Sequence, residues 1–174
     1  SDLMAQLPVM DLLGDVAQIC RQAPTPTLIS AYVRAARRFC QKSRWLVVSI
    51  PGQTAAGESR YTLGSDPYAE IFGVAGITMY ESPTKFEALT ESDSSTWDPT
   101  AAPGLPELYQ YLPEAQVALH LTPDRAYNMT IAACVTPKRG ANSIDASLAT
   151  KWEYVLQHGA LAYLLALPDV AWAN

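Results

Sequence analysis

The stretch RRFCQKSRWLVVSI, residues 37–50, contains the boundary on which the predicted fold depends. Before this boundary, apolar residues recur at the three- and four-residue spacing of an α-helix. From Leu46 onward the apolar residues form short runs rich in branched side chains, a pattern typical of β-strands. The change of period predicts that a helical region ends at about Trp45 and that a β region begins there.

Two helices are expected before the boundary. The first covers residues 8–22 and ends at APTP, residues 23–26, because a proline ring clashes with a helix interior. Thr25 is the expected N-cap of the second helix, with Pro26 at its first helical position. The second helix is expected to bury one stripe of side chains: Ile29, Tyr32, Val33, Ala36, Phe39 and Cys40.

The region 46–137 is expected to be β. Short runs such as LVVSI and QVALHL are separated by turn signals such as PGQTAAGE and TPDR, which favours an antiparallel sandwich or a small barrel. One long segment, TESDSSTWDPTAAPGLPE at residues 90–107, interrupts these strands. Loops of this length in a compact domain are often contact elements.

A third long helix is expected at residues 144–167, capped by Asn142 or Ser143 and ended by Pro168. Its first half has an apolar line formed by Ile144, Leu148, Trp152 and Val155. Its second half is apolar nearly all round, so we expect it to be covered on more than one side. Its small residues are expected to let another backbone approach closely: Gly159, Ala162 and Ala166.

Helices at both ends therefore enclose a β region. This order predicts an α+β fold in which residues 1–45 and 138–174 form a terminal-helix bundle. Residues 46–137 are expected to form an inserted lobe, either an antiparallel β-sandwich or a small barrel.

Composition restricts the functional classes. The 174 residues carry a net charge of −5, so the chain has no overall electrostatic reason to hold nucleic acid. Three sparse cysteines without metal-ligand spacing are expected to be buried, reduced thiols. The most apolar stretch, residues 159–167, is far shorter than the ~20 residues that a membrane span needs, so no membrane partner is expected.

No catalytic constellation is evident. His120 and His158 are far apart and have no Ser or Cys nucleophile motif beside them, so both are expected to be structural. Carboxylates in the long loop are candidates for acid–base work or are simply solvated: Glu91, Asp93, Asp98 and Glu107. Phosphate-loop and zinc motifs do not occur. We therefore expect no enzyme, no cofactor and no metal.

Basic residues cluster at the end of the second helix. Five of the 12 Lys and Arg residues fall there: Arg34, Arg37, Arg38, Lys42 and Arg44. The first four lie opposite the apolar stripe. They are either a solvated face near a helix C-terminus or a surface for an acidic partner, which would be a neighbouring subunit or DNA phosphate in a channel.

Three segments carry a resemblance to a known family. YVRAARRFCQKSRWL, residues 32–46, resembles the second helix of head-to-tail adaptor proteins of tailed bacteriophages, which carry an A-x-x-x-F-C-x-x-[ST]-R pattern. GLPELYQY followed by VALHLTPDRAYNMTIAACVTPKR is similar to their β segment. GALAYLLALPDVAWAN, residues 159–174, is similar to their closing helix with its GALxxLLxxPxxxW pattern.

The resemblance implies a structural virion protein that assembles in the bacterial cytoplasm and ends in the neck of the particle. It implies a homo-oligomeric ring, generally of twelve copies, that docks on the portal protein, connects it to the next tail component and lets double-stranded DNA pass. Family members often continue beyond the tryptophan motif into an arm that reaches the portal. Such an arm is either unused here or absent from this sequence, which ends at Asn174.

The terminal segment is a second candidate contact. Pro168 stops the preceding helix, so the remaining apolar residues are expected in extended chain at a joint with another subunit or the portal: Val170 and Trp172, together with Asn174. The alternative is that Trp172 folds back on its own bundle near Tyr32 or Trp152.

Two other functions remain open. One is a tail-completion or tail-terminator ring. The other is a carbohydrate-binding β-sandwich in which Trp97, Tyr109 and Tyr111 form an aromatic platform.

Overall fold

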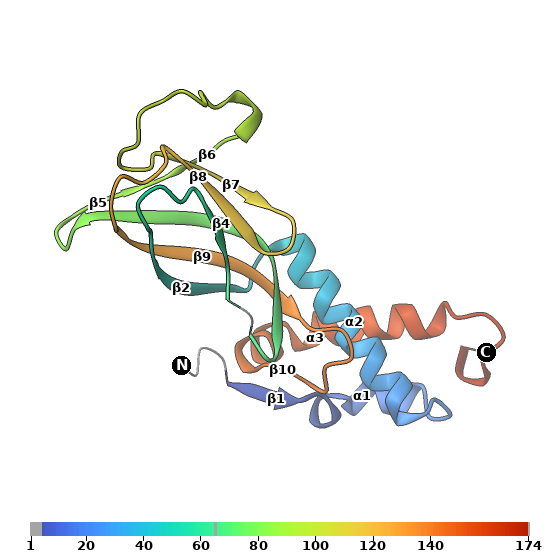
Figure 1. The fold of residues 1–174 in the computed structure, drawn as a ribbon. Coiled ribbons are helices and arrows are strands. Elements are labelled where there is room, and N and C mark those ends of the chain that lie inside the picture. Colours follow the sequence, from blue (N-terminus) through green and yellow to red (C-terminus); the bar gives the residue numbers. More distant parts are fainter. Residues whose placement is uncertain (1–4, 65, 174) are drawn as a thin grey trace. The chain divides into compact units, whose positions relative to one another are not determined.

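The computed structural model describes residues 5–64 and 66–173. In this part of the chain there are three α-helices and ten strands (Figure 1). The helices are α1 (Gly14–Ile19), α2 (Thr25–Ser43) and α3 (Ala146–Leu165). The strands are β1 (Gln6–Pro8), β2 (Val47–Gln53), β3 (Arg60–Thr62), β4 (Ala69–Ser82), β5 (Lys85–Ala88), β6 (Thr90–Glu91), β7 (Leu108–Leu112), β8 (Gln116–His120), β9 (Asn128–Pro137) and β10 (Ser143–Asp145).

The chain divides into two compact units. The first unit comprises Ser1–Leu46, Asp66–Glu70 and Thr136–Asn174. The second unit comprises Val47–Ser65 and Ile71–Val135. Strands β4 and β9 each contribute residues to both units, so the polypeptide passes between the units at residues 46–47, 65–66, 70–71 and 135–136.

The second unit is built from two four-stranded sheets. One sheet has the order β2-β9-β4-β5, and the other has the order β3-β8-β7-β6. The β6–β7 pair is parallel, whereas β2–β9, β4–β5, β3–β8 and β7–β8 are antiparallel. Because side chains alternate between the faces of a strand, each sheet presents one apolar face, and these faces share a core. The core residues are Leu63, Val74, Ile77, Met79, Leu89, Tyr109, Val117, Leu119, Tyr127, Met129 and Ile131.

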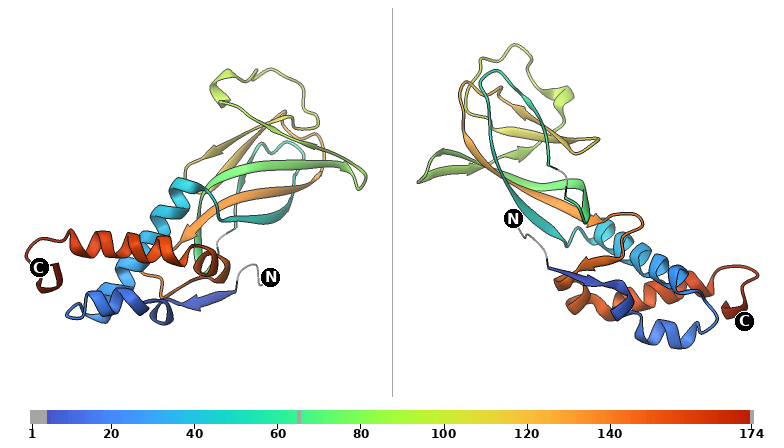
Figure 2. Two further views of the ribbon diagram at one scale, coloured as in Figure 1. Left: turned by 180° about the vertical axis from the view of Figure 1, so that it is seen from behind. Right: turned by 60° about the horizontal axis from the view of Figure 1, so that its bottom comes forward.

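The first unit is a pair of long helices with smaller elements around them. Helices α2 and α3 pack side by side, and the short α1 contacts both (Figure 2). Strands β1 and β10 form a two-stranded antiparallel sheet in which Leu7 lies opposite Ile144. The ideal Cβ position of Gly159 in α3 lies 3.0 Å from Cβ of Ala35 in α2, so this glycine permits the close approach of the two helices.

The predicted terminal-helix bundle is wrong. Helices account for 33% of the residues, and strands in several sheets make up much of the rest. Only two of the three described helices are long, because residues 9–12 of the expected first helix form a short 3-10 helix and α1 itself spans six residues. Two long helices cannot enclose a core among themselves, so α1 and the β1–β10 sheet complete the packing of the first unit.

Both terminal helices begin later than the apolar periodicity predicted. Residues 6–8 pair with residues 143–145, and an extended backbone in a sheet cannot also be helical. Helix α3 therefore starts after Asp145, whose carboxylate accepts a hydrogen bond from the backbone N–H of Leu148 at 3.0 Å. Asp145 thus takes the capping role that was expected of Asn142 or Ser143.

Helix α3 is less covered than its composition suggests. Trp152 has a non-helical backbone conformation, so α3 consists of two helical segments that meet at a kink. Its ring packs against Phe39 and Trp45, with centroid distances of 4.9 and 5.9 Å. Beyond the kink only one face is buried, and the opposite face exposes Tyr154, Val155 and Leu165. The expectation that several sides are covered is not met within this chain.

The three cysteines, Cys20, Cys40 and Cys134, are buried, and none of them forms a disulfide within the described residues. Burial raises the pKa of the Cys40 thiol to about 12, and the nearby Asp145 carboxylate adds to this effect. Burial likewise raises the pKa of the Cys20 thiol. The neutral thiol is therefore the folded form at ordinary pH, as expected of a small apolar core residue.

We predict that Gly159→Val destabilises the chain by about 1–3 kcal/mol, because the added side chain meets Ala35 at a helix contact that has no room. Urea denaturation followed by circular dichroism measures this difference. Gly14→Val is the matched control, because an ideal Cβ at Gly14 in α1 has no neighbour within 4 Å. Equal stabilities of the Gly159→Val variant and the wild type would show that the α2–α3 contact is looser than described.

Candidate functional site

A basic groove runs along α2 in the first unit. Its volume is about 950 Å³, large enough to accept several side chains of a partner. Helix α2, the turn at residues 139–142 and the side chain of Tyr163 in α3 form its walls. Ile29 and Val33 supply apolar surface, whereas the charged lining consists entirely of arginines: Arg34, Arg37, Arg38 and Arg139.

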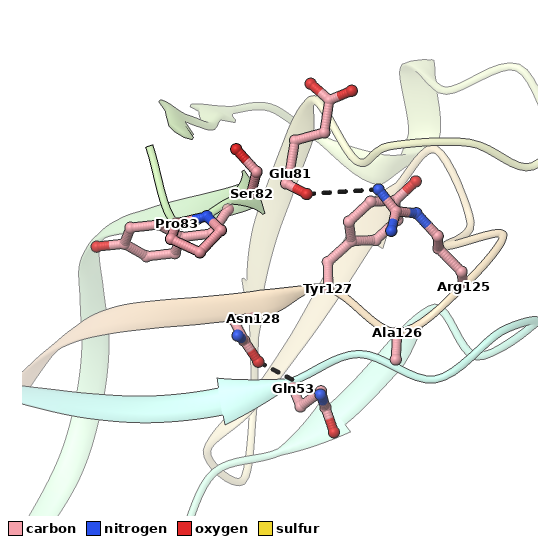
Figure 3. A pocket seen from close by; sticks show the side chains of 9 residues that line it. Gln53, Glu81, Ser82, Pro83, Arg125, Ala126, Tyr127 and Asn128 are labelled. Carbon is pink, nitrogen blue, oxygen red and sulfur yellow. Dashed lines mark hydrogen bonds between the residues drawn. The ribbon is translucent and has the colours of Figure 1, made fainter. Parts of the chain in front are cut away.

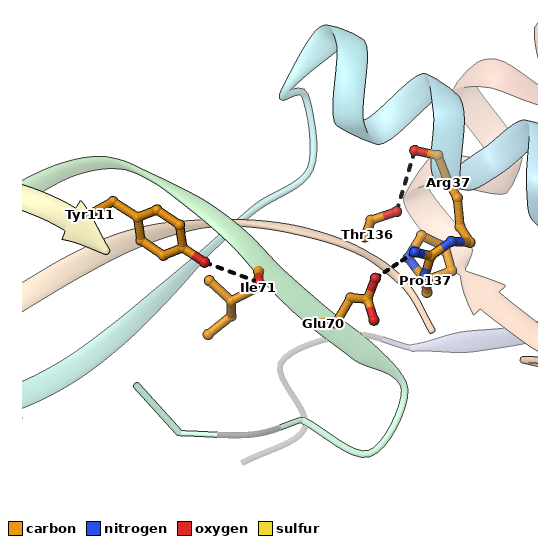
Figure 4. A network of polar contacts seen from close by, with 6 residues as sticks. All are labelled: Arg37, Glu70, Ile71, Tyr111, Thr136 and Pro137. Atoms are coloured by element: carbon orange, nitrogen blue, oxygen red, sulfur yellow. Dashed lines mark hydrogen bonds and ion pairs between the residues drawn. The ribbon is translucent and has the colours of Figure 1, made fainter. Parts of the chain in front are cut away.

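Arg37 is the anchored member of this set (Figure 4). Its guanidinium donates a hydrogen bond to the carbonyl oxygen of Pro137, and its Nη2 lies 2.5 Å from Oε1 of Glu70. The hydroxyl of Thr136 donates to the backbone carbonyl of Arg37 at 3.4 Å. Only 13% of the Arg37 side chain is exposed. Arg37 therefore has a structural role, and its charge is largely neutralised by Glu70.

The second unit has a separate polar contact between a tyrosine and a strand backbone, also drawn in Figure 4. The hydroxyl of Tyr111 in β7 donates to the carbonyl oxygen of Ile71 in β4 at 3.5 Å. This bond connects one strand of each sheet within that unit.

The other groove arginines carry uncompensated charge. The Arg34 guanidinium lies over the ring of Tyr163, 4.5 Å from its centroid, a cation–π contact that fixes its position without neutralising it. Arg38 and Arg139 are exposed and have no carboxylate partner among the described residues. Guanidinium groups in this state suit carboxylate or phosphate oxygens, which they bind through paired N–H donors.

Not all of the basic residues that form a cluster in the sequence line the groove. Arg34 and Arg38 are four residues apart and share one face of α2, so both reach the groove. Lys42 is exposed near the end of α2 and does not line the groove. Arg139 was missed by sequence analysis because it lies about a hundred residues from α2 in the chain. Its position depends on the turn after β9, which no local pattern reveals.

The three small residues that were expected to form one packing face of α3 lie in different environments. Gly159 meets α2, whereas Ala162 and Ala166 are exposed. These two alanines continue the uncovered apolar face that Tyr154 and Leu165 expose on α3.

The terminal segment folds back on its own helix. Pro168 and Asp169 turn the chain after α3, and Trp172 donates a hydrogen bond from its indole nitrogen to the carbonyl oxygen of Leu164 at 3.2 Å. Val170 and Trp172 are half-buried, and the partner of Trp172 is neither Tyr32 nor Trp152. Asn174, the last residue proposed for this joint, lies outside the described residues.

The second unit has a smaller hollow of about 450 Å³ beside the β4–β5 turn (Figure 3). Arg125 lies over the ring of Tyr127, 4.5 Å from its centroid, and donates to the carbonyl oxygen of Glu81 at 3.4 Å. Gln53 donates to Asn128 at 3.3 Å. The one carboxylate of the lining, Glu81, pairs with Lys85. This hollow offers already paired polar groups and no acid–base pair.

The remaining candidate chemical groups are dispersed. His120 stacks on Trp97 at a centroid distance of 5.4 Å, and His158 contacts Tyr154 at 4.2 Å. No group of three or more His, Cys, Asp or Glu side chains is arranged to hold a metal ion among the described residues. Tyr109 is only 3% exposed within the core, so Trp97, Tyr109 and Tyr111 do not form an exposed sugar-binding platform.

Charge is divided unequally between the two units. The first unit contains nine Lys and Arg residues and eight Asp and Glu residues, whereas the second contains three and nine. The formal charges are therefore +1 and −6, which together give the −5 of the whole chain. Residues 86–124 contain seven carboxylates and no Lys or Arg. The groove is thus a basic surface in a chain that is otherwise acidic.

No protein-family model matches the sequence, and no significant match was found among curated proteins. Within the described part of the chain, no helix combines the length and the apolar character that crossing a membrane requires.

We predict that Arg37→Met lowers the free energy of unfolding by about 1–3 kcal/mol, because it leaves the Pro137 carbonyl and the Glu70 carboxylate without their donor. Arg38→Met is the matched control on the same helix. It removes a charge that has no partner within the described residues, and its effect should stay within about 0.5 kcal/mol. Urea denaturation compares the two variants, and similar stabilities would contradict the structural role of Arg37.

We predict that Trp172→Ala lowers the free energy of unfolding of the isolated chain by about 1–2 kcal/mol. The half-buried ring loses apolar contact, and the Leu164 carbonyl loses its indole donor. Trp172→Phe keeps the apolar ring and removes only the donor, so its effect should be about half as large. An unchanged thermal transition of the alanine variant would instead favour docking of Trp172 onto another molecule.

Proposed function

We propose that this protein is a structural subunit of a head-to-tail adaptor ring in a tailed bacteriophage. In this proposal several copies, generally twelve in the family that the sequence resembles, assemble beneath the portal protein. The ring then connects the portal to the next tail component and surrounds the DNA that leaves the head.

The observation that carries the proposal is the division of charge between the two units. A cyclic ring of identical subunits uses a heterologous interface, in which one surface of each copy meets a different surface of the next. Oppositely charged surfaces on one chain favour this arrangement, since like surfaces repel when they meet. The +1 unit with its arginine groove and the −6 unit supply two such surfaces.

The resembling segments also support the proposal. Residues 32–46 and 159–173 of the resembling segments belong to α2, α3 and the chain directly after each helix, and α2 packs against α3 in the first unit. Phe39 contacts Trp152, Gly159 approaches Ala35, and Trp172 bonds to Leu164. Residues of the two resembling segments therefore make intramolecular contacts that stabilise the first unit.

The acidity of the chain suits a conduit for DNA. Binding to phosphates requires clustered positive charge, and it slows release. A protein of net charge −5 repels the duplex on average, so DNA passes without being held. In this proposal the groove arginines serve contacts between proteins.

The test uses DNA-filled heads that carry the portal protein and lack this protein. We predict that the purified chain adds a ring of density at the portal vertex in negative-stain electron microscopy, and that it adds nothing to shells without portal. Rings found only at the distal end of completed tails would indicate a tail terminator. Absence of density at the portal vertex would contradict the proposal.

A further inference from the structure

The groove along α2 offers a surface without an occupant, and the acidic unit offers a segment of matching chemistry. We propose that the basic groove of one copy receives the acidic loop, residues 90–107, of a neighbouring copy. This inference rests on the proposed ring, and it adds which two surfaces meet when the copies associate.

The acidic loop carries only negative charge. It contains four exposed carboxylates and no Lys or Arg: Glu91, Asp93, Asp98 and Glu107. None of them forms an ion pair within the described residues, where the two ion pairs are Arg37–Glu70 and Lys85–Glu81. The loop and the groove arginines therefore both retain charge that an intermolecular contact can neutralise.

Local hydrogen bonds order the acidic loop. Asp93 accepts from the backbone N–H of Ser95 at 2.9 Å, and Asp98 accepts from the hydroxyl and the backbone N–H of Thr100 at 2.7 and 2.9 Å. These bonds lower the pKa of both carboxyl groups, so both stay ionised at neutral pH. Because the loop is already ordered, docking costs little additional conformational entropy.

Two further contacts attach this loop to its own sheets. The backbone N–H of Ser94 donates to Gln110 at 3.0 Å, and Trp97 stacks on His120. The middle of the loop nevertheless extends away from the strands of its unit (Figures 1 and 2). Asp93 and Asp98 thus belong to an ordered element between β6 and β7, while Glu91 in β6 and Glu107 directly before β7 are exposed at its two ends.

The groove complements this loop in charge. Arg34, Arg38 and Arg139 are the cations available for pairing, since Arg37 is already bound to Glu70. Guanidinium groups bind carboxylates through two parallel N–H donors. Ile29 and Val33 add apolar surface at which water is excluded when a partner enters, and exclusion of water strengthens charge pairing.

A second copy of this chain fits the groove better than DNA does. A DNA duplex carries only negative charge and is repelled by the −6 unit, whereas a second copy also carries an arginine groove of its own. A second copy brings the acidic unit itself, whose charge of −6 is attracted by the same arginines.

The experiment reverses charge on each side separately. The groove variant is Arg38→Glu with Arg139→Glu. The loop variant is Glu91→Arg with Glu107→Arg, which leaves Asp93 and Asp98 with their hydrogen bonds. Each variant alone should associate with itself at least about tenfold more weakly than the wild type, because like charges then meet. Sedimentation velocity measures free association, and electron microscopy measures assembly on portal-bearing heads.

The mixture of the two variants is the decisive sample. The unchanged loop of the groove variant fits the unchanged groove of the loop variant, and the two reversed surfaces fit each other. Equimolar mixing should therefore restore alternating assembly that neither variant achieves alone. Circular dichroism verifies that both variants are folded, and restoration itself excludes misfolding as the cause of the separate failures.

Matched charge reversals outside the two surfaces are the controls. Arg21→Glu with Lys42→Glu repeats the charge change of the groove variant, and Glu58→Arg with Glu87→Arg repeats that of the loop variant. Both controls should assemble like the wild type.

The outcomes separate this inference from the proposed function. Normal assembly of both charge-reversed variants on portal-bearing heads overturns the groove–loop contact and leaves the adaptor function standing. Normal assembly of the groove variant with lost binding to double-stranded DNA identifies a phosphate surface, which also overturns the inference. Wild-type self-association that depends on groove and loop, without any binding to the portal, supports the contact and contradicts the adaptor function. A wild type that never self-associates contradicts both.

Discussion

The first unit depends on one arginine that joins three distant parts of the chain. Arg37 in α2 contacts Glu70 at the start of β4 and Pro137 at the end of β9, and Thr136 returns a hydrogen bond to its backbone. These partners come from sequence positions where the chain passes between the two units. A planar guanidinium with several donors can serve a carbonyl and a carboxylate together, whereas a lysine offers one point charge.

The pairing of Arg37 with Glu70 determines which groove arginines retain charge for binding a partner. Once the charge of Arg37 is matched by Glu70, the remaining positive charge belongs to Arg34, Arg38 and Arg139, which face the groove. Neighbouring arginines therefore have different functions on one helix. Arg37 is held by Glu70 and Pro137, whereas Arg34, Arg38 and Arg139 have no carboxylate partner among the described residues and are the arginines that the proposed contact uses.

The proposed assembly also assigns a use to apolar surface that the described chain leaves exposed. Helix α3 exposes Tyr154, 73% accessible, together with Val155 and Leu165 on one face. Contiguous exposed apolar residues of this kind mark contact surfaces in soluble proteins. The groove on α2 and this face of α3 lie in the same unit, so in the proposed ring the helical unit supplies both charge and apolar area for contact between subunits.

The sequence by itself determined where the structure changes type. The loss of helical period at Trp45 and its return, expected at Ile144 and observed from Ala146, depend on local spacing, which backbone geometry translates into helix or strand. The positions of charged residues can also be read directly from the sequence. They identified the cluster of Arg34, Arg37 and Arg38 as a candidate site.

Only the tertiary structure decided how that cluster is used. The pairing of Arg37 with Glu70, the position of Arg139 in the groove and the strand at residues 143–145 each join residues separated by 33 to 139 positions. The spacing of apolar residues indicates only local secondary structure. It does not indicate which distant residues form the β1–β10 pair or an ion pair. Strand pairing includes Pro8, Ile144 and Asp145, which local spacing assigned to helices, and residues 9–12 form a 3-10 helix in place of an α-helix, so the first unit has only two long helices and not the expected bundle.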